Sequence, residues 1–462
     1  MTKKKKPNVF KKIGKGFKNF YDRFVRGSIY TKISYLIMGF GNLARGQIWK
    51  GMIFLVCQVG FVLLMVLCPE INSTPFGYKA FANLITLGDN PGDINTAADN
   101  SMLMLLFGVL MIGITFLYLA LYVSNTKSSY HNDMLLKEGK KVSNFKEDLH
   151  DLTDSKFHLT MMIPAMVGIL IFTLLPTIFM ILIAFTNYDS LHTGQNLVDW
   201  VGFSNFAQIF NGSASEIGTM FFPVLGWTFV WAFIATFSNY FLGIFLGILI
   251  NKRGIKAKVL WRTIFILTIA LPQFITLLAV RKILGNLGPV NTLLVKLGIL
   301  ASPVEFLDQA ANEFTARGMV LLINLWIGIP YTMLQTSGIL MNIPKDLYEA
   351  ATVDGATRRQ TFWKITFPYI LFVTTPYLIS SFVGNITSFN IIYLLTGGGP
   401  TNPGFKAGET DLLVTWLYKL TIDENEYNMG AVISIMTFII TASITLIFYS
   451  RSKAFKQEDA FQ

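Results

Sequence analysis

The sequence predicts an all-α polytopic membrane protein with eight transmembrane helices. Of its 462 residues, 52% are apolar and only 14% are charged, whereas a soluble domain carries about 25% charged residues. The apolar residues occur in blocks of 18 to 28, and each block can cross a hydrocarbon core of ~30 Å as a helix that rises about 1.5 Å per residue. These observations exclude collagen, a disordered chain and nucleic-acid binding as the principal class.

The eight expected spans contain no Asp, Glu, Lys or Arg. Their approximate limits are 51–68, 102–123, 160–186, 223–250, 263–280, 318–341, 367–387 and 428–450. The seventh span can continue to Thr396, and we expect residues 33–43 to form either an interfacial helix or a shallow re-entrant one.

Basic residues fix the expected orientation. The segments 1–50, 124–158, 251–262, 342–366 and 451–462 hold 31 of the 38 Lys and Arg, so the positive-inside rule predicts both termini in the cytoplasm. Residues 1–34 have a local charge of +10, against +11 for the whole chain. We expect this run to anchor on anionic lipid rather than on nucleic acid. It precedes the first apolar block without a cleavage site, so no signal peptide is expected.

The cysteines and histidines predict no metal site and no internal disulfide. Cys57 and Cys68 are 11 residues apart on one expected helix, which is ~16 Å and too far for a bridge. The four histidines show no ligand spacing with each other or with cysteine.

We divide the chain into five parts. They are a basic cytoplasmic arm (1–50), a two-span unit (51–123), a polar cytoplasmic linker with some helix (124–158), a six-span core (159–450) and a cytoplasmic tail (451–462). The helix-breaking residues Pro164, Pro176, Pro272, Gly328 and Pro330 all lie within spans of the core. Such breaks indicate the bundle interior or a substrate pathway, although each could also be a simple packing kink.

Residues 342–368, between the sixth and seventh spans, predict a helix, a turn and a second helix. Pro344 suits a first helical turn, Gly355 suits a left-handed helix stop, and Thr357 with Gln360 suits a capping box. A face of mostly small residues runs along the first helix, namely Leu347, Ala350, Ala351 and Asp354. From these properties alone, the segment could be any amphipathic cytosolic loop.

The same segment resembles the signature of the membrane permease subunits of ABC importers. That signature runs Glu-Ala-Ala, three residues, Gly, nine residues, Ile, one residue, Leu-Pro, and this chain matches it at Glu349, Ala350, Ala351, Gly355, Ile365 and Pro368, with Phe367 replacing Leu. The resemblance implies a six-helix type I permease core whose loop 342–368 couples to a separate ATPase, Glu349 making the contact and Gly355 the turn. It also implies a second permease subunit, two copies of a cytoplasmic ABC ATPase that hold the ATP and Mg, and an extracytoplasmic sugar-binding protein.

A wider resemblance, over residues 160–450, is to the maltose/maltodextrin (MalF-like) sugar permeases. It is carried by the segments 199–206, 271–272, 326–331, 381–385 and 394–400. One departure is the second external loop, which has about 36 residues here, whereas enteric relatives carry a folded domain there. This leaves open how a binding protein docks.

Polar residues on the seventh span suggest the kind of cargo. Ser381, Asn385 and Ser388 are spaced i, i+4 and i+7, and an uncharged stripe suits a neutral ligand with many hydroxyls. Alternatively, these side chains only hydrogen-bond a neighbouring helix. The family resemblance maps sugar contacts onto Gln273, Ile327, Gly328, Tyr331, Ser381, Gly384, Asn385 and Ser388. Gln273 replaces an aromatic residue and Ser388 an Asn of the enteric permease.

We therefore expect the permease subunit of an ATP-driven oligosaccharide importer, with a maltodextrin as cargo. The chain has no phosphate-binding loop sequence and no hydrolase motif, so we expect no enzymatic activity, no catalytic residue and no cofactor on this chain. The alternative is an ion-coupled secondary sugar transporter. The spans lack the carboxylate or histidine that proton coupling normally needs, but sodium coupling through carbonyls at the broken helices stays open.

Overall fold

The computed structural model describes residues 9–71, 74–90, 99–192, 197–212, 216–252 and 254–451. Its contacts divide the chain into two compact units, Met1–Trp200 and Val201–Gln462, which are described separately below. Lys3 to Lys6 of the basic arm and residues 452–462 of the expected tail lie outside the described residues.

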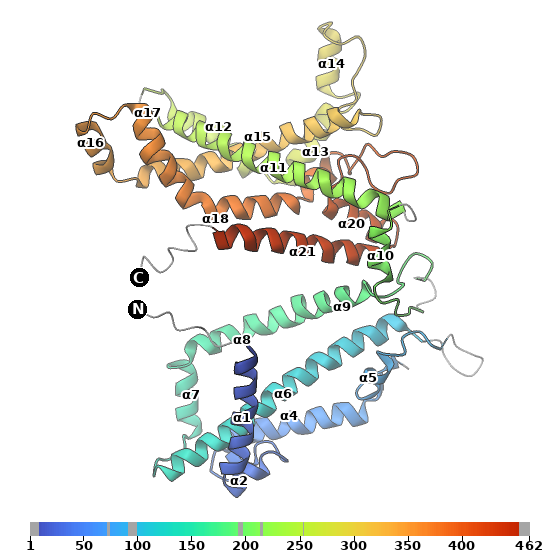
Figure 1. Cartoon of the computed structure of the whole chain (residues 1–462), viewed down its shortest axis with the longest axis vertical. Coiled ribbons are helices and arrows are strands. Elements are labelled where there is room, and N and C mark those ends of the chain that lie inside the picture. Colours follow the sequence, from blue (N-terminus) through green and yellow to red (C-terminus); the bar gives the residue numbers. More distant parts are fainter. Residues whose placement is uncertain are drawn as a thin grey trace. The chain divides into compact units, whose positions relative to one another are not determined.

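The first unit is built mainly from helices (Figure 1), with one pair of two-residue strands among its described residues. Its elements are α1 (Val9–Arg26), α2 (Ile29–Ile33), α3 (Phe40–Leu43), α4 (Ile48–Leu67), β1 (Glu70–Ile71), β2 (Thr74–Pro75), α5 (Lys79–Asn83), α6 (Ser101–Lys137), α7 (Phe145–Thr153), α8 (Phe157–Ile169), the π-helix η1 (Leu170–Leu174) and α9 (Leu175–Ile183). The strands pair antiparallel, with Glu70 opposite Pro75.

The second unit has helices joined by loops, with no strand among its described residues. Its elements are α10 (Ser204–Phe210), α11 (Glu216–Asn251), α12 (Lys258–Ala270), α13 (Gln273–Leu284), α14 (Pro289–Lys296), α15 (Glu313–Asn342), α16 (Lys345–Val353), α17 (Arg358–Thr361), the π-helix η2 (Phe362–Thr366), α18 (Phe367–Ile386), α19 (Asn390–Leu395), α20 (Leu413–Ile422) and α21 (Tyr427–Arg451). Helices α11, α15, α18 and α21 form its long bundle, in which α11 packs on α15 and α18 (Figure 1).

All eight predicted spans have counterparts among the described helices. Seven are single stretches long and apolar enough to cross a membrane, and the eighth is a pair of helices. The third span runs through Phe157–Ile183 and the seventh through Arg358–Ile386. The prediction of a polytopic helical membrane protein is therefore confirmed. The sequence predicts these spans because charged residues are rare in segments that must lie in lipid.

The fifth span is the one that differs in form. We predicted a span over 263–280 with a helix-breaking residue at Pro272, and the chain does break there: the segments Lys258–Ala270 and Gln273–Lys296 are bent by 95° at Leu271 and Pro272. Pro272 lacks an N–H and restricts the preceding residue to extended conformations, so the helix cannot continue through it.

Two helix boundaries also differ from the sequence prediction. Helix α6 continues to Lys137, through the first part of the expected linker, and at 37 residues it is about 55 Å long. Helix α18 ends at Ile386 and does not continue to Thr396, because residues 387–389 interrupt it before α19 begins.

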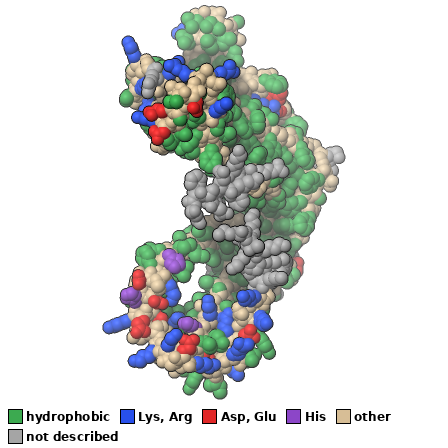
Figure 2. Space-filling model, turned by 60° about the vertical axis from the view of Figure 1, so that its left-hand side comes forward, with side chains coloured by type: hydrophobic (Ala, Val, Ile, Leu, Met, Phe, Trp, Pro, Cys, Tyr) green, Lys and Arg blue, Asp and Glu red, His purple; other side chains and the backbone are tan. Residues whose placement is uncertain are grey.

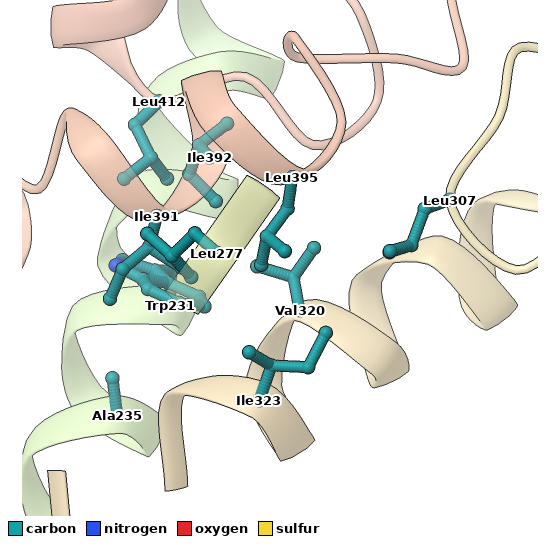
Figure 3. Close-up of a cluster of buried hydrophobic side chains, with 10 residues drawn as sticks. All are labelled: Trp231, Ala235, Leu277, Leu307, Val320, Ile323, Ile391, Ile392, Leu395 and Leu412. Atoms are coloured by element: carbon teal, nitrogen blue, oxygen red, sulfur yellow. The ribbon is translucent and has the colours of Figure 1, made fainter. Parts of the chain in front are cut away.

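A buried apolar cluster holds the second unit together. It joins Trp231 of α11, Leu277 of α13, Val320 of α15 and Ile392 of α19 (Figure 3). These helices are far apart in sequence, so their shared core fixes the positions of the segments that carry the candidate site.

The loop that follows α19 is fixed by buried polar contacts. Thr396 and Thr410 share a hydrogen bond of 2.7 Å, and the Lys419 ammonium lies 2.6 Å from the Asp411 carboxylate. Burial raises the pKa of the Asp411 carboxyl, while Lys419 opposes that shift. This network holds the loop and thereby the end of α19.

Candidate functional site: an uncharged chamber and a surface hairpin

A cavity of about 520 Å³ lies in the second unit where the broken pair α12/α13 meets α11, α15 and α18. None of the described residues that line it is charged; they are Asn239, Thr268, Ile269, Ala270, Leu271, Pro272, Gln273, Asn324, Ile327, Gly328, Tyr331, Tyr377, Ser381, Asn385 and Ile391. We call this cavity the chamber. Its size and its few polar groups on an apolar wall are typical of a small-molecule site.

The break between α12 and α13 supplies backbone groups to the chamber. Because Pro272 has no N–H, the Thr268 carbonyl lacks its usual helical partner four residues on. Thr268 and Ala270 end α12 at the chamber, and Gln273 begins α13 there. Helix ends carry unpaired carbonyls on one side and unpaired N–H groups on the other, so the break offers both acceptors and donors without a formal charge.

Helix α15 presents one continuous face to the chamber. Asn324, Ile327, Gly328 and Tyr331 follow the i, i+3, i+4, i+7 spacing that places residues on one side of a helix. Tyr331 is 48% exposed, and its ring centroid lies 5.6 Å from that of Tyr377. The chamber therefore has an aromatic wall beside its polar groups, which suits the C–H faces of a sugar.

Helix α18 adds Tyr377, Ser381 and Asn385, which are spaced four residues apart. The Asn385 side-chain amide donates to Thr236 Oγ1 at 2.8 Å, and Trp231 donates to the Asn385 backbone carbonyl at 3.1 Å. Asn385 thus hydrogen-bonds a neighbouring helix, as the alternative in the sequence analysis expects, and it also lines the chamber. The two interpretations left open by the sequence do not exclude each other.

The structure brings six of the eight predicted sugar-contact residues to the chamber. Gln273, Ile327, Gly328, Tyr331, Ser381 and Asn385 line it. Gly384 and Ser388 are not among the lining residues. Ser388 lies beyond the end of α18, so the predicted stripe stops at Asn385. The sugar-binding role of all eight residues stays a prediction.

Two chamber residues, Asn239 and Asn324, were missed from the sequence. Asn239 Oδ1 and Asn324 Nδ2 are buried and have no hydrogen-bond partner within the described part of the chain. Leaving such a group unsatisfied costs about 1–3 kcal/mol, so both atoms favour a ligand or water in the chamber. The sequence offers a pattern that could have indicated each of them. Asn324 extends the face of Ile327 and Tyr331 by one helical turn, and Asn239 is the one carboxamide between residues 217 and 250.

The segment 342–368 folds as predicted, into two helices joined by a turn. Gly355 has φ +74°, and it ends α16 because the Ala356 N–H reaches the Ala351 carbonyl and the Gly355 N–H the Thr352 carbonyl. Thr357 and Gln360 form the predicted capping box. Pro344 is the N-cap and not a residue of the first turn. We call residues 342–368 the surface hairpin.

The surface hairpin is tied to the chamber through one continuous helix. The hydroxyls of Tyr348 and Thr366 lie 3.0 Å apart and join α16 to η2. From Arg358 the chain then runs without interruption to Ile386, through the chamber residues Ser381 and Asn385. One helical stretch, which includes the π-helix η2, therefore joins the hairpin to the chamber wall.

The outer side of the surface hairpin carries both charge and apolar surface. Glu349 is exposed, and its side chain has no hydrogen bond or ion pair among residues that the structure describes. Val353 is 88% exposed, whereas Ala351 is buried at 8%, so the small-residue face that we predicted is only partly presented outward. Charged side chains of both signs lie at the end of this unit with α16 and α17 (Figure 2), and others, such as Glu409 and Lys419, lie at its opposite end.

The described residues contain no group of three or more His, Cys, Asp or Glu side chains that could hold a metal ion. Cys57 and Cys68 are both free. The chemistry available at the chamber is therefore that of neutral hydrogen-bonding groups and aromatic rings.

Apolar helices around an uncharged chamber, with a hairpin exposed at one end of the bundle, define a membrane permease. The comparisons identify the family. Residues 239–457 match the family of the binding-protein-dependent transport system inner membrane component. The chain therefore belongs to the permease subunits of ABC importers, in the branch that contains the maltodextrin and maltose permeases.

Three curated relatives match nearly the whole chain. The maltodextrin transport system permease protein MalC of Streptococcus pneumoniae is 37% identical over 435 residues, which cover 92% of this chain and 96% of the relative. MdxF of Bacillus subtilis, also a maltodextrin permease, is 35% identical over 92% of this chain and 95% of the relative. GanP of Bacillus subtilis, a galactooligosaccharides permease, is 34% identical, with 92% and 97% covered.

Solved structures support the fold. A chain of a bacterial ABC transporter involved in the import of alginate aligns with a TM-score of 0.51 and 20% identity over 66% of this chain and 97% of that chain. A chain of the alginate transporter in complex with its pentasaccharide-bound periplasmic protein aligns with a TM-score of 0.53 and 22% identity, with the same shares covered.

Proposed function

We propose that this chain is one of two permease subunits of an ATP-driven importer of neutral oligosaccharides, with a maltodextrin as its cargo. The observation that carries this proposal is the chamber, which combines carboxamides, hydroxyls, backbone groups and aromatic rings with no charged residue. Hydroxyl groups of a sugar need both donors and acceptors. An ion or a carboxylate would find no counter-charge there.

The proposed assembly follows from the family. The surface hairpin would enter a cytoplasmic ATPase present in two copies, and those subunits would hold ATP and Mg²⁺. A second, different permease subunit would complete the pathway, an extracytoplasmic binding protein would deliver the sugar, and both termini would face the cytoplasm of a bacterial cell. The names of MalC and MdxF favour maltodextrin, and that of GanP shows that relatives of this branch differ in their neutral sugar.

In the proposed cycle, the residues of this chain bind and orient the sugar and respond to the ATPase. Asn239, Asn324 and Asn385 would donate to and accept from sugar hydroxyls, and Tyr331 would stack on the ring. Movement of the surface hairpin would tilt the Arg358–Ile386 helix and change the shape of the chamber. Such coupling requires that the Arg358–Ile386 helix has two arrangements, and that both the surface hairpin and the chamber change the balance between them.

Competition in uptake tests the proposed cargo. Cells that express the complete transporter should take up labelled maltotriose. An excess of unlabelled maltotetraose should suppress this uptake, whereas an acidic alginate trisaccharide should not, because the chamber offers no cation. Equal suppression by the alginate trisaccharide and by maltotetraose would contradict the assignment of a neutral cargo.

Asn385→Ala tests the sugar-binding role of the chamber. Removing this half-buried carboxamide should raise the sugar concentration for half-maximal uptake about tenfold, since a hydrogen bond of this kind contributes ~1.5 kcal/mol. Ser380→Ala is the control on the same helix, because Ser380 is exposed and is not among the residues that line the chamber. A normal dose response for Asn385→Ala, with normal assembly, would leave Asn385 with a packing role alone.

A further inference from the structure

A second cavity, in the first unit, is lined by three basic side chains that the transport function does not use. It has a volume of about 480 Å³ and lies between α1 and the C-terminal part of α6. Its lining residues are Asn19, Asp22, Arg23 and Arg26 from α1 and Lys127, Tyr130, His131 and Met134 from α6. We call it the basic cavity.

Helical spacing builds the two walls of the basic cavity. On α1 the residues Asn19, Arg23 and Arg26 follow an i, i+4, i+7 pattern, and the four residues on α6 follow i, i+3, i+4, i+7. Tyr35 fastens α1 by donating to the Phe20 carbonyl at 2.8 Å, and the Phe20 and Tyr35 rings pack 5.0 Å apart. The cavity is therefore a consequence of how α1 is held against α6.

The basic cavity has more positive charge than its own residues neutralise. Arg23, Arg26 and Lys127 face the single carboxylate of Asp22, and none of them forms an ion pair within the described ranges. Arg23 Nε donates to the Asn19 carbonyl at 3.1 Å, whereas its Nη1 is buried and has no hydrogen-bond partner in the part of the chain that the structure describes. A buried donor on a charged group is costly to leave unpaired, so the cavity favours an anion.

The position along α6 places the basic cavity at the membrane surface. A hydrocarbon core takes about 20 helical residues, and Lys127 lies 26 residues after Ser101, the first residue of α6. The side of α1 away from the cavity carries Phe17 and Tyr21, which are 74% and 66% exposed. Aromatic side chains on a basic amphipathic helix are typical of the level of lipid headgroups.

We propose that the basic cavity binds a phosphate group, either in the headgroup of an anionic phospholipid or in a soluble phosphate ester. Two guanidinium groups and one ammonium are the side chains best suited to phosphate oxygens. Their surplus of two positive charges over Asp22 equals the charge of a phosphate monoester dianion and exceeds that of a phosphodiester by one. The Tyr130 hydroxyl and the Asn19 amide add neutral donors.

The test uses the full-length chain in nanodiscs, with its melting temperature as the readout. In phosphatidylcholine discs, increasing fractions of phosphatidylglycerol should raise the melting temperature along a saturating curve. Arg26→Gln with Lys127→Gln should raise the half-saturating fraction about tenfold, because two charge-assisted contacts are lost. Both residues are exposed, so the double variant should melt normally in phosphatidylcholine alone. Lys15→Gln with Lys18→Gln, on the same helix but outside the cavity, should behave as the unaltered chain.

A second arm identifies the source of the phosphate. Glycerol 3-phosphate added to pure phosphatidylcholine discs should stabilise the chain if the cavity accepts a soluble ester, and should have no effect if it requires a lipid. Stabilisation by either probe supports the site if it is lost in the Arg26→Gln, Lys127→Gln variant and retained in the Lys15→Gln, Lys18→Gln variant. The proposal is overturned if neither probe stabilises the chain, or if the two double variants respond alike, since diffuse surface charge would then explain the binding.

Discussion

Replacing Glu349 by Lys is expected to abolish sugar uptake while the helical bundle stays folded. Glu349 is exposed on α16 and its side chain has no partner among the described residues, so reversing its charge should not disturb the hairpin. If Glu349 faces a cation of the ATPase, like-charge contact would cost several kcal/mol. Uptake of labelled maltotriose and the amount of ATPase that co-purifies should therefore both fall at least about thirtyfold.

Asp154→Lys is the matched control for this charge reversal. Asp154 is an exposed carboxylate at the end of α7, so the substitution changes the net charge equally without touching the surface hairpin. Normal uptake by the Glu349→Lys variant would remove the coupling role from Glu349. Equal loss in both variants would point to the total charge and not to the hairpin.

Replacing Gly328 by Leu should eliminate transport by filling the chamber. A Cβ atom at this position would collide with the Asn239 side chain, and the rest of the leucine would occupy space beside Tyr331. Overpacking of this kind costs about 1–3 kcal/mol, and the sugar would also lose its binding volume. We expect no measurable binding of maltotriose to the purified complex, against normal binding by the unaltered chain.

Gly318→Leu, on the same helix, separates this effect from a general effect on α15. Nothing lies within 4 Å of a Cβ atom at Gly318, so this variant should assemble and transport normally. Transport by the Gly328→Leu variant at the normal rate would show that the sugar does not pass through the chamber.

The sequence predicts the spans and the surface hairpin well because both depend on local rules. Lipid excludes charged residues from a helix, and Gly355, Thr357 and Gln360 determine their turn and cap within a few residues. The angle at Pro272 could not be predicted, since a proline breaks a helix without fixing the direction in which the next one leaves. The chamber itself depends on packing between helices far apart in sequence.

The least predictable features are those set by the partners of a side chain in three dimensions. Asn239 and Asn324 gain their interest from atoms left without a hydrogen bond, which no sequence pattern reveals. Ser388 shows the reverse case. Its spacing from Ser381 places both on one face only if the helix continues to Ser388, whereas α18 ends at Ile386. The basic cavity likewise needs α1 to lie against α6, although each helix alone has an ordinary basic surface.

The most direct test of the account is transport by the purified complex in sealed proteoliposomes. With the binding protein and maltotriose outside and ATP with Mg²⁺ inside, the account predicts sugar accumulation in the absence of any ion gradient, and none when ATP is replaced by a non-hydrolysable analogue. Accumulation driven by a sodium or proton gradient without ATP would contradict it and would favour the ion-coupled alternative.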